Sequence, residues 1–551
     1  MIKLQGYQAP QKVNLRVAIV EDNTTARMNL RSHLMSIDSF DIASYSNGKE
    51  LRNGLRTSNF DAVFIDFHLG QAKNGVEWIQ QLKETGLLKP STGIFFITSD
   101  SLPQTIGQIL DLYPDAIIIK PYTIKNLSTT VKHYLHARKH LLPALQYMDQ
   151  KKEEHALEFL NEQLRKGISK RIESDFIKLK GRLLISAKRF DEATQLYSSI
   201  LERSNGVLWA HWGLIKSEFF TGKWQHCKKM LDKLIEESLT KDKAYEWLAS
   251  VEIGKKNYFL AEQLLDNIKD SELTIQATRL KTLCYKMQGK TEDAIALLEK
   301  KVQSNLSVKE RLVDYAMELA RYHLHLAEQF RESQQLCLKD EYADYVSSAR
   351  VMLGKASRNI NDRHAALQKD TMLALAFLLD NDLPRAERII KETSEEHQFT
   401  KANVSTMIDA VKVWFGLGHK DKAKEILEKC DDQLLEQENH IESLIATDLV
   451  INIEKSLGLE KERALKVNEK GMKAYSNKKY AEALTYFYRA YSMFPGVPAF
   501  ALNLLQCLTD AKQTEYKGIT IDILILELSG LSLSDNNKKR MHAIKEKLAL
   551  A

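Results

Sequence analysis

The fold of the first part of the chain is decided by four short stretches: RVAIVED at residues 16–22, AVFID at 62–66, IFFITS at 94–99 and IIIKP at 117–121. Each is a nearly continuous apolar run that ends in charged or hydroxyl-bearing residues. Runs of this kind are typical of strands that helices cover on both faces of a parallel sheet. The charged ends therefore mark the places where the strands leave the core.

A regular alternation of strands and helices surrounds these stretches. Strands are expected at Arg16–Val20, Ile42–Tyr45, Ala62–Ile65, Ile94–Thr98 and Ala116–Ile119. Helices are expected to begin near Thr24, Gly48, Gly75 and Pro103, and again after Thr123. Five strand–helix units in about 125 residues predict one parallel α/β sheet with helices on both sides.

Polar side chains stand where four of the predicted strands end. The first strand ends in Glu21 and Asp22, the third in Asp66, the fourth in Thr98 and the fifth in Lys120. The carboxyl ends of parallel strands meet at one edge of a sheet, so we expect these side chains to lie together. Clustered carboxylates repel one another and bind Mg²⁺ through oxygen, and a carboxylate can accept a phosphoryl group. An ammonium and a hydroxyl would stabilise the transferring oxygens.

The motifs IVEDN, VFID, FFITSD and IIIKP have the order and spacing of the CheY-like receiver domain of two-component response regulators, and this part of the chain resembles that family. The resemblance implies a flavodoxin-like, five-stranded parallel sheet with strand order 2-1-3-4-5. It implies that Asp66 is the phosphoacceptor, that Thr98 binds one phosphoryl oxygen and that Lys120 pairs with another.

The same resemblance implies a set of ligands for one cofactor, Mg²⁺. Asp22 and Asp66 would bind the ion, Glu21 would bind it directly or through water, and the backbone carbonyl of His68 would supply a further oxygen. The bond between Lys120 and Pro121 is expected to be cis.

The chain departs from the family pattern in two places. An aromatic residue often stands three positions before the conserved lysine and moves inward together with the hydroxyl residue, here Thr98. This chain has Ile117 at that position, so we expect its switch to depend on shifts of a loop and of the fourth helix. The loop HLGQAKNGVE after Asp66 is slightly longer than usual and lacks the common proline, which leaves its shape open.

The rest of the chain shows a repeat of helical hairpins. An aromatic, a small and a large residue recur every 34 residues, as Phe190/Ala193/Tyr197, Trp224/Cys227/Leu231 and Tyr258/Ala261/Leu265. Fixed periods of this size predict a solenoid, with Gly222, Gly254 and Gly289 in the tight turns. The pattern resembles the tetratricopeptide repeat, most closely at Gly471, Tyr480, Ala483, Phe487, Ala490 and Pro495. The tryptophans Trp209, Trp212, Trp224 and Trp247 are interpreted as core of this all-α array rather than as a ligand box.

These patterns predict four segments. Residues 1–137 would form the receiver, 138–170 a helical connector, 171–510 the repeats and 511–551 a set of capping helices. The stretch 311–370 is helical but out of register, so we expect it to diverge. Residues 137–155 look helical throughout, which predicts a stiff junction.

Composition excludes several classes of partner. The chain has 551 residues and a net charge of +6, a weak field for its length, so neither nucleic acid nor acidic lipid is expected to bind. Its five cysteines form no CxxC pair, which favours a reducing compartment over a zinc or redox site. No apolar run approaches the ~20 residues that cross a bilayer. We expect a cytoplasmic protein without membrane insertion.

The leading hypothesis is a phosphorylation-switched response regulator with a protein-binding output, similar to bacterial regulators of the VieB type. A sensor histidine kinase would phosphorylate Asp66, and an unknown protein, such as another component of the same phosphorelay, would bind the concave face of the solenoid. No catalytic motif follows residue 140, so the chain is not expected to be an enzyme beyond its own phosphotransfer and autodephosphorylation.

Other functions stay open at this point. The chain could bind a sensor kinase or a second regulator and block phosphotransfer. It could also remove phosphate from a partner receiver through a side chain such as Gln225 or Gln263. DNA binding is disfavoured because no helix-turn-helix with a basic recognition helix is recognisable. Formation of a homodimer is left open too.

Overall fold

The computed structural model describes residues 15–70, 73–99, 103–110, 112–236, 240–332, 339–360, 363–396, 399, 402–437 and 439–549. The chain divides into two compact units, one of residues 1–189 with 238–243 and one of residues 190–237 with 244–551.

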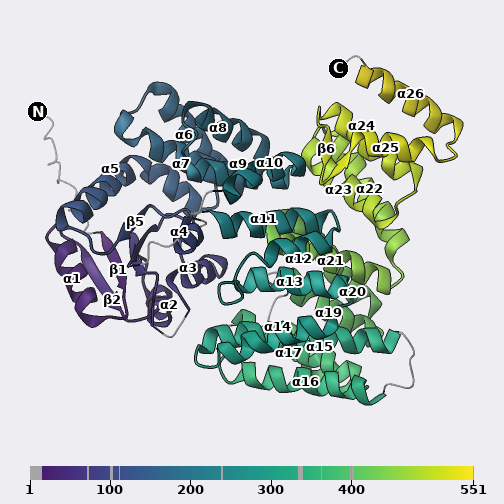
Figure 1. The fold of residues 1–551 in the computed structure, drawn as a ribbon, viewed down its shortest axis with the longest axis horizontal. Helices are drawn as coiled ribbons and strands as arrows, with labels where there is room; N and C mark the ends of the chain where they lie inside the picture. Colours follow the sequence, from purple (N-terminus) through teal and green to yellow (C-terminus); the bar gives the residue numbers. More distant parts are fainter. Residues whose placement is uncertain are drawn as a thin grey trace, which may run out of the picture. The chain divides into compact units, whose positions relative to one another are not determined.

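The first unit contains a five-stranded parallel sheet with strand order β2-β1-β3-β4-β5, as predicted (Figure 1). Its strands are β1 (Arg16–Val20), β2 (Asp41–Tyr45), β3 (Ala62–Asp66), β4 (Gly93–Thr98) and β5 (Ala116–Ile119). Asp66 pairs with Ile97 and Thr98 with Ile119, so β3, β4 and β5 end at the same edge. Each strand lies within one residue of its predicted bounds.

Helices cover both faces of this sheet. Helices α1 (Thr24–Met35) and α5 (Ile124–Asp149) lie on one face, and α2 (Gly48–Thr57), α3 (Gly75–Glu84) and α4 (Pro103–Leu110) lie on the other. Alternate strand residues reach the two cores: Phe64 packs on the α1–α5 side and Ile65 on the α2–α4 side. Burial on both faces explains why the strands are continuous apolar runs.

Polar caps start the helices that follow the strands. Asn23, Asn47, Asn74 and Thr123 each accept a hydrogen bond from a backbone N–H of the first helical turn. Asn74 also forms a reciprocal capping box with Glu77. These caps satisfy backbone donors that a helix otherwise leaves unpaired, and they fix the turns that leave the carboxyl edge of the sheet.

Helix α5 continues past residue 137 and carries a helical pair, α6 (Glu153–Lys166) and α7 (Lys170–Ser186). His133 of α5 contacts Asp175 of α7, with 3.0 Å between Nε2 and Oδ2. The prediction of unbroken helix over 137–155 is wrong at residues 150–152, where Lys151 has a φ of 56° and the chain turns. Helices α5, α6 and α7 belong to the same compact unit as the sheet.

The second unit is an array of antiparallel helices. Its helices are α8 (Phe190–Arg203), α9 (Leu208–Phe220), α10 (Trp224–Ile235), α11 (Lys241–Gly254), α12 (Tyr258–Leu265), α13 (Ile275–Met287), α14 (Thr291–Ser304), α15 (Lys309–Glu332), α16 (Lys339–Ser357), α17 (Arg363–Leu379), α18 (Leu383–Glu396), α19 (Val404–Gly416), α20 (Lys420–Glu436), α21 (His440–Ser456), α22 (Glu460–Ser476), α23 (Tyr480–Met493), α24 (Pro498–Asp510), α25 (Ile521–Ser529) and α26 (Asp535–Ala549). A short hairpin, β6 (Glu515–Tyr516) and β7 (Ile519–Thr520), precedes α25 and was not predicted.

The turns between paired helices share one backbone signature. A residue with positive φ stands two positions before the second helix, at Gly222, Lys256, Gly289, Asn381, Gly418, Gly458 and Lys478. The predicted turn glycines are therefore confirmed at Gly222 and Gly289. The prediction is wrong at Gly254, which lies inside α11, where a Cβ would stand 2.1 Å from the ring of Trp224. Gly254 is small because of that packing, and Lys256 makes the turn.

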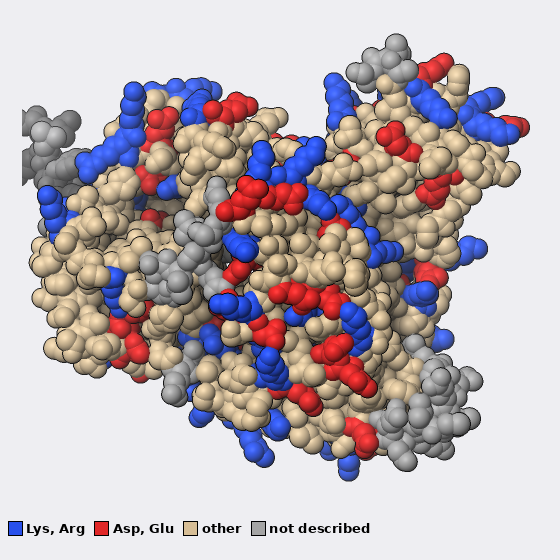
Figure 2. Space-filling model, viewed as in Figure 1, with Lys and Arg blue, Asp and Glu red and all other residues tan. Residues whose placement is uncertain are grey.

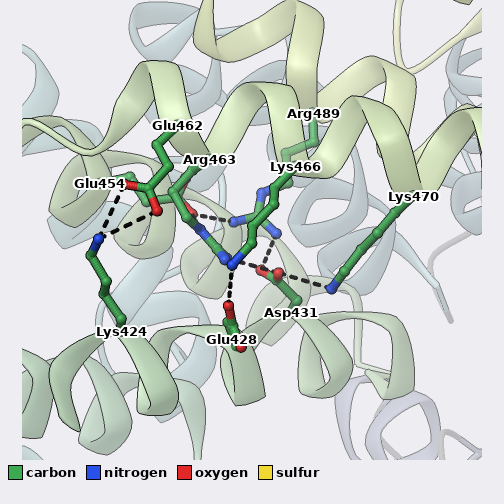
Figure 3. A network of polar contacts seen from close by, with 9 residues as sticks. All are labelled: Lys424, Glu428, Asp431, Glu454, Glu462, Arg463, Lys466, Lys470 and Arg489. Carbon is green, nitrogen blue, oxygen red and sulfur yellow. Dashed lines mark hydrogen bonds and ion pairs between the residues drawn. The ribbon is translucent and has the colours of Figure 1, made fainter. Parts of the chain in front are cut away.

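A buried ionic quartet joins four helices near the end of the array. Asp431 of α20 and Glu454 of α21 pair with Arg463 of α22 and Arg489 of α23 (Figure 3). Arg463 donates to Asp431 at 2.8 Å and to Glu454 at 3.0 Å, and Arg489 donates to Glu454 at 2.6 Å. All four side chains are at most 9% exposed. Charges buried this deeply are tolerated only because they are paired.

Replacing Glu454 with Gln is expected to destabilise the chain by about 3–5 kcal/mol, because two buried guanidinium groups would then share one carboxylate. Glu462→Gln on α22 is the matched control. It removes an exposed partner of Lys424 and should change stability by less than about 1 kcal/mol. Urea unfolding followed by circular dichroism measures both, and equal losses would contradict the importance assigned to the quartet.

Mild acid is expected to destabilise the second unit through His323 of α15. This side chain is 6% exposed, and burial lowers its pKa from 6.5 to about 4. Below pH 6.5 His323 is protonated in the unfolded chain but stays neutral in the folded chain, so stability falls as the pH drops toward 4. At pH 5 the loss amounts to about 2 kcal/mol. His323→Phe should remove that part of the difference between urea midpoints at pH 7 and pH 5.

Candidate functional site

An ammonium group bridges two carboxylates at the carboxyl edge of the sheet. Lys120 Nζ lies 2.5 Å from Asp66 Oδ2 and 2.6 Å from Glu21 Oε2. Asp66 is 7% exposed and Glu21 is 4% exposed. The structure thus brings together three residues that stand on three different strands or their ends, as the pattern of strand ends predicts.

The backbone holds each of these groups in place. Asp66 Oδ1 accepts from the His68 N–H at 3.0 Å, and Glu21 Oε1 accepts from the Asn23 N–H at 3.2 Å. The Lys120 N–H donates to the carbonyl of Thr98 at 2.7 Å, which ties the end of β5 to the end of β4. Thr98 itself is fully buried.

Burial and pairing set the charges of the site. Burial, together with the neighbouring Asp66 carboxylate, raises the pKa of Glu21, and Lys120 only partly opposes this. Burial lowers the pKa of Lys120, but its hydrogen bonds to Asp66 and Glu21 outweigh that effect and leave the pKa raised. Lys120 therefore stays charged at neutral pH and is the cation that holds the two carboxylates together.

Two glycines let the loop after β3 fold closely over the site. The Gly75 N–H donates to the carbonyl of Phe67 at 2.8 Å, and a Cβ on Gly75 would stand 2.3 Å from the Asp66 carbonyl oxygen. Gly70 has a φ of 68°, and a Cβ there would lie 3.2 Å from Asp22 Oδ2. The loop, which the sequence left open, thus returns against Asp66 and Asp22; residues 71–72 lie outside the described part.

The remaining predicted residues lie around this cluster. Asp22 and His68 are exposed at its mouth, next to the buried Glu21 and Asp66. Ile117 is half-buried and packs against the core on the α2–α4 side of the sheet. The bond between Lys120 and Pro121 is cis, as predicted.

The carboxylates of Glu21, Asp22 and Asp66 form an oxygen-only donor set, which suits a small hard cation such as Mg²⁺. Within the described residues, no three acidic, histidine or cysteine side chains are already grouped for metal binding. The chemistry of these oxygen donors fits Mg²⁺. In this structure the Lys120 ammonium pairs with two of the three carboxylates, those of Glu21 and Asp66.

One residue near the site escaped the sequence analysis. Arg27, one turn into α1, donates to the backbone carbonyl of Glu21 at 2.5 Å and to that of Asp22 at 3.3 Å. These two hydrogen bonds hold the backbone of the acidic pair in place. No local pattern marks it, because a surface arginine on an amphipathic helix has many other uses.

Residues that were considered as output sites lie on the second unit. Gln225 and Gln263 are exposed on α10 and α12. Trp212, Trp224 and Trp247 are buried in an apolar cluster, so the interpretation of these three as core is confirmed. The cysteines Cys227, Cys284, Cys430 and Cys507 are buried free thiols, and Cys337 lies outside the described residues.

The surface shows no single dominant charge on the face drawn in Figure 2, where basic and acidic side chains are interspersed. A basic stripe that could follow a phosphate backbone is not visible on that face. Of the helices that the structure describes, none combines the length and the apolar character needed to cross a bilayer.

Comparison with known protein families agrees with this fold. Residues 17–132 match the response regulator receiver domain family. Among solved structures, a beryllofluoride-activated DrrB receiver domain is 21% identical, with 22% of this chain and 99% of that chain covered and a TM-score of 0.20. The signal receiver domain of a modulated diguanylate cyclase from Desulfovibrio desulfuricans G20 is 28% identical, with coverage of 23% and 97% and a TM-score of 0.21.

A solved structure is similar to the helical region as well. A tetratricopeptide repeat protein from Parabacteroides merdae is 14% identical, with 53% of this chain and 98% of that chain covered and a TM-score of 0.35. The paired helices and their shared turns have the architecture of such repeats. Residues 17–132 thus match the response regulator receiver domain family, and a region of paired helices follows them.

Proposed function

We propose that this protein is a response regulator whose Asp66 accepts a phosphoryl group from a sensor histidine kinase, and whose phosphorylation changes the protein contacts of the helical region. The observation that carries the proposal is the Glu21–Lys120–Asp66 cluster at the carboxyl edge of a receiver domain. A half-buried, charged lysine beside an aspartate is suited to stabilise negative charge that moves onto that aspartate.

The proposed transfer uses the polar groups at the carboxyl edge of the sheet. A carboxylate oxygen of Asp66 attacks the phosphorus of a kinase phosphohistidine, an O–P bond forms, and the N–P bond breaks with its electron pair returning to the imidazole. Lys120 then pairs with a phosphoryl oxygen, and the Thr98 hydroxyl donates to another. Glu21, Asp22, Asp66 and the His68 carbonyl would hold Mg²⁺, which when bound neutralises charge on the transferring oxygens.

Incubation of the chain with acetyl phosphate and Mg²⁺ should add one phosphoryl group, and Asp66→Asn should add none. Lys120→Met is expected to slow the reaction by about 10²–10³-fold, since a single preorganised donor to a developing anion contributes that much. The controls Asp38→Asn and Lys125→Met replace exposed residues of the same types and should react like the parent. Phos-tag gels and intact mass measure the product, and chelation of Mg²⁺ with EDTA should stop its formation.

If Asp66→Asn is phosphorylated as fast as the parent, Asp66 is not the acceptor. If Asp66→Asn does not react but Lys120→Met reacts at the parental rate, Asp66 is the acceptor and the role assigned to the Lys120 ammonium is wrong.

The first unit offers a direct route from this site to the helical pair α6–α7. Lys120 follows directly after β5, and α5 begins four residues later at Ile124 and runs to Asp149. On the way its His133 contacts Asp175 of α7, and the ring of Tyr113, between α4 and β5, lies under the Arg182 guanidinium of α7 at 5.9 Å. A shift of β5 when Lys120 changes partner therefore reaches α7 through packed elements.

Beryllofluoride, which mimics the phosphoryl group, is expected to change amide hydrogen exchange in α7 (Lys170–Ser186) of the full chain as well as in β4 and β5. Asp66→Asn should abolish both changes. Asp175→Ala removes the contact to His133, so it should weaken the response in α7 while phosphorylation proceeds at the parental rate. A response that stops before α5 in the parent would contradict this route.

A further inference from the structure

Helix α21 lies against the inner helices of hairpins that are far from it in the sequence. In helical-repeat arrays the first helix of each hairpin lines the concave surface, and α9, α11 and α13 hold that place in the first hairpins of this unit. The first turns of α21 contact all three of these helices. Part of the surface predicted to bind a partner is thus already covered by the chain itself.

The contact begins with an aromatic stack. The His440 ring lies parallel to the ring of Trp247 on α11, with 3.5 Å between centroids and 9° between planes. It also meets the ring of Phe219 on α9 edge-on at 5.7 Å. His440, Trp247 and Phe219 are each less than 10% exposed, so a tight pocket of two aromatic residues holds this imidazole.

Aliphatic anchors follow on the same side of α21. Ile441 is fully buried in the apolar cluster of α11, α12 and α13, which includes Ile253 and Leu280. Ile445 packs on that cluster, and Leu444 packs on the tryptophan cluster that contains Trp247. Anchors at i, i+3 and i+4 are the pattern with which an amphipathic helix lies in a groove.

Charge fixes the register of the helix in this groove. Glu442 pairs with Arg279 of α13, 163 residues away in the chain. One turn and a half further on, burial raises the pKa of Asp448, and Lys286 of α13 partly opposes that shift. Burial likewise lowers the pKa of Lys286. Lys286 and Asp448 attract each other electrostatically, so charged as well as apolar groups lie along this contact.

The second half of α21 is held differently. Val450 and Ile453 pack in the core that contains α19, Ala446 of the second turn packs there too, and Glu454 belongs to the buried quartet. The far end of α21 is therefore anchored locally, while its first two turns reach into the groove of α9, α11 and α13.

We propose that the groove formed by α9, α11 and α13 is a helix-binding site and that α21 occupies it as an intramolecular ligand. The external partner it fits is an amphipathic helix that presents a flat ring, two or three aliphatic side chains and a carboxylate in the order found in His440–Ile445. Such a helix must displace the first turns of α21 before it binds. This inference extends the proposed protein-binding role of the helical region, but it does not depend on phosphorylation of Asp66.

A labelled synthetic peptide of residues 439–457 tests the proposal by fluorescence anisotropy with the unphosphorylated full chain. The parent should bind it weakly, because the tethered α21 competes at a high effective concentration. Glu442→Arg in the chain sets two cations against each other at Arg279 and should raise peptide affinity at least tenfold. Ile441→Asp in the chain should act in the same direction.

The controls separate release of the groove from general damage. Ile523→Asp puts the same charge on a residue of α25 that is 45% exposed, and it should leave peptide binding at the parental level. Arg279 is left unchanged in all variants, because it also pairs with Glu318 of α15 at 3.3 Å. A peptide that carries Ile441→Asp should bind none of the chains.

Two results would overturn the inference. One is that Glu442→Arg and Ile441→Asp remain folded and bind the peptide no better than the parent, which would make α21 a permanent part of the core. The other is that Glu442→Arg alone abolishes cooperative thermal unfolding, since a groove that collapses without its occupant cannot exchange ligands. Neither result bears on whether Asp66 is phosphorylated, and failure of phosphorylation would leave the peptide result intact.

Discussion

Two buried carboxylates stand side by side in the receiver, and the ammonium of Lys120 is what allows them to do so. Glu21 follows β1 and Asp66 ends β3, which is its neighbour in the sheet, while Lys120 follows β5, two strands further on. Strands β3 and β5 are roughly 10 Å apart, because β4 lies between them. The Lys120 side chain can cross this distance only if β4 ends in a small residue. Thr98 at the end of β4 meets this condition, so sheet order, side-chain length and the size of one residue jointly form the site.

The same arrangement would make the site sensitive to the proposed phosphorylation of Asp66. Lys120 divides its charge between two acidic partners, and its backbone N–H is bonded to Thr98. A phosphoryl group on Asp66 offers the ammonium a stronger anion, which changes its pairing with Glu21 and draws on β4 and β5 together. Ile117 packs in the core and offers no polar group to this change, so the proposed response would pass through the backbone of β5 into α5.

The sequence predicted the sheet and the grouping of Glu21, Asp66 and Lys120 because both depend on local signals. Runs such as AVFID are apolar throughout, since both faces of the strand are covered, and the residue that ends each run is placed by strand order alone. The hairpin β6–β7 had no such signal, because its strands are two residues long. It is held by Tyr516, which is buried, and by the Lys517 N–H, which donates to the carbonyl of Gly222 at 2.7 Å. The prediction for Gly254 was wrong because a glycine near a helix end marks a turn or a close contact equally well.

The position of α21 could not be inferred from its sequence either, and it changes what the helical region implies. HIESLI reads as an ordinary amphipathic stretch, and only the distant Trp247 and Arg279 show that it fills a groove. A partner for that groove meets a site that is open only in the fraction of molecules whose α21 has left, so its apparent affinity falls by that fraction. Any event that loosens the first turns of α21 then raises the affinity without adding a contact. A solenoid that carries its own ligand is for this reason better suited to switched binding than an empty one.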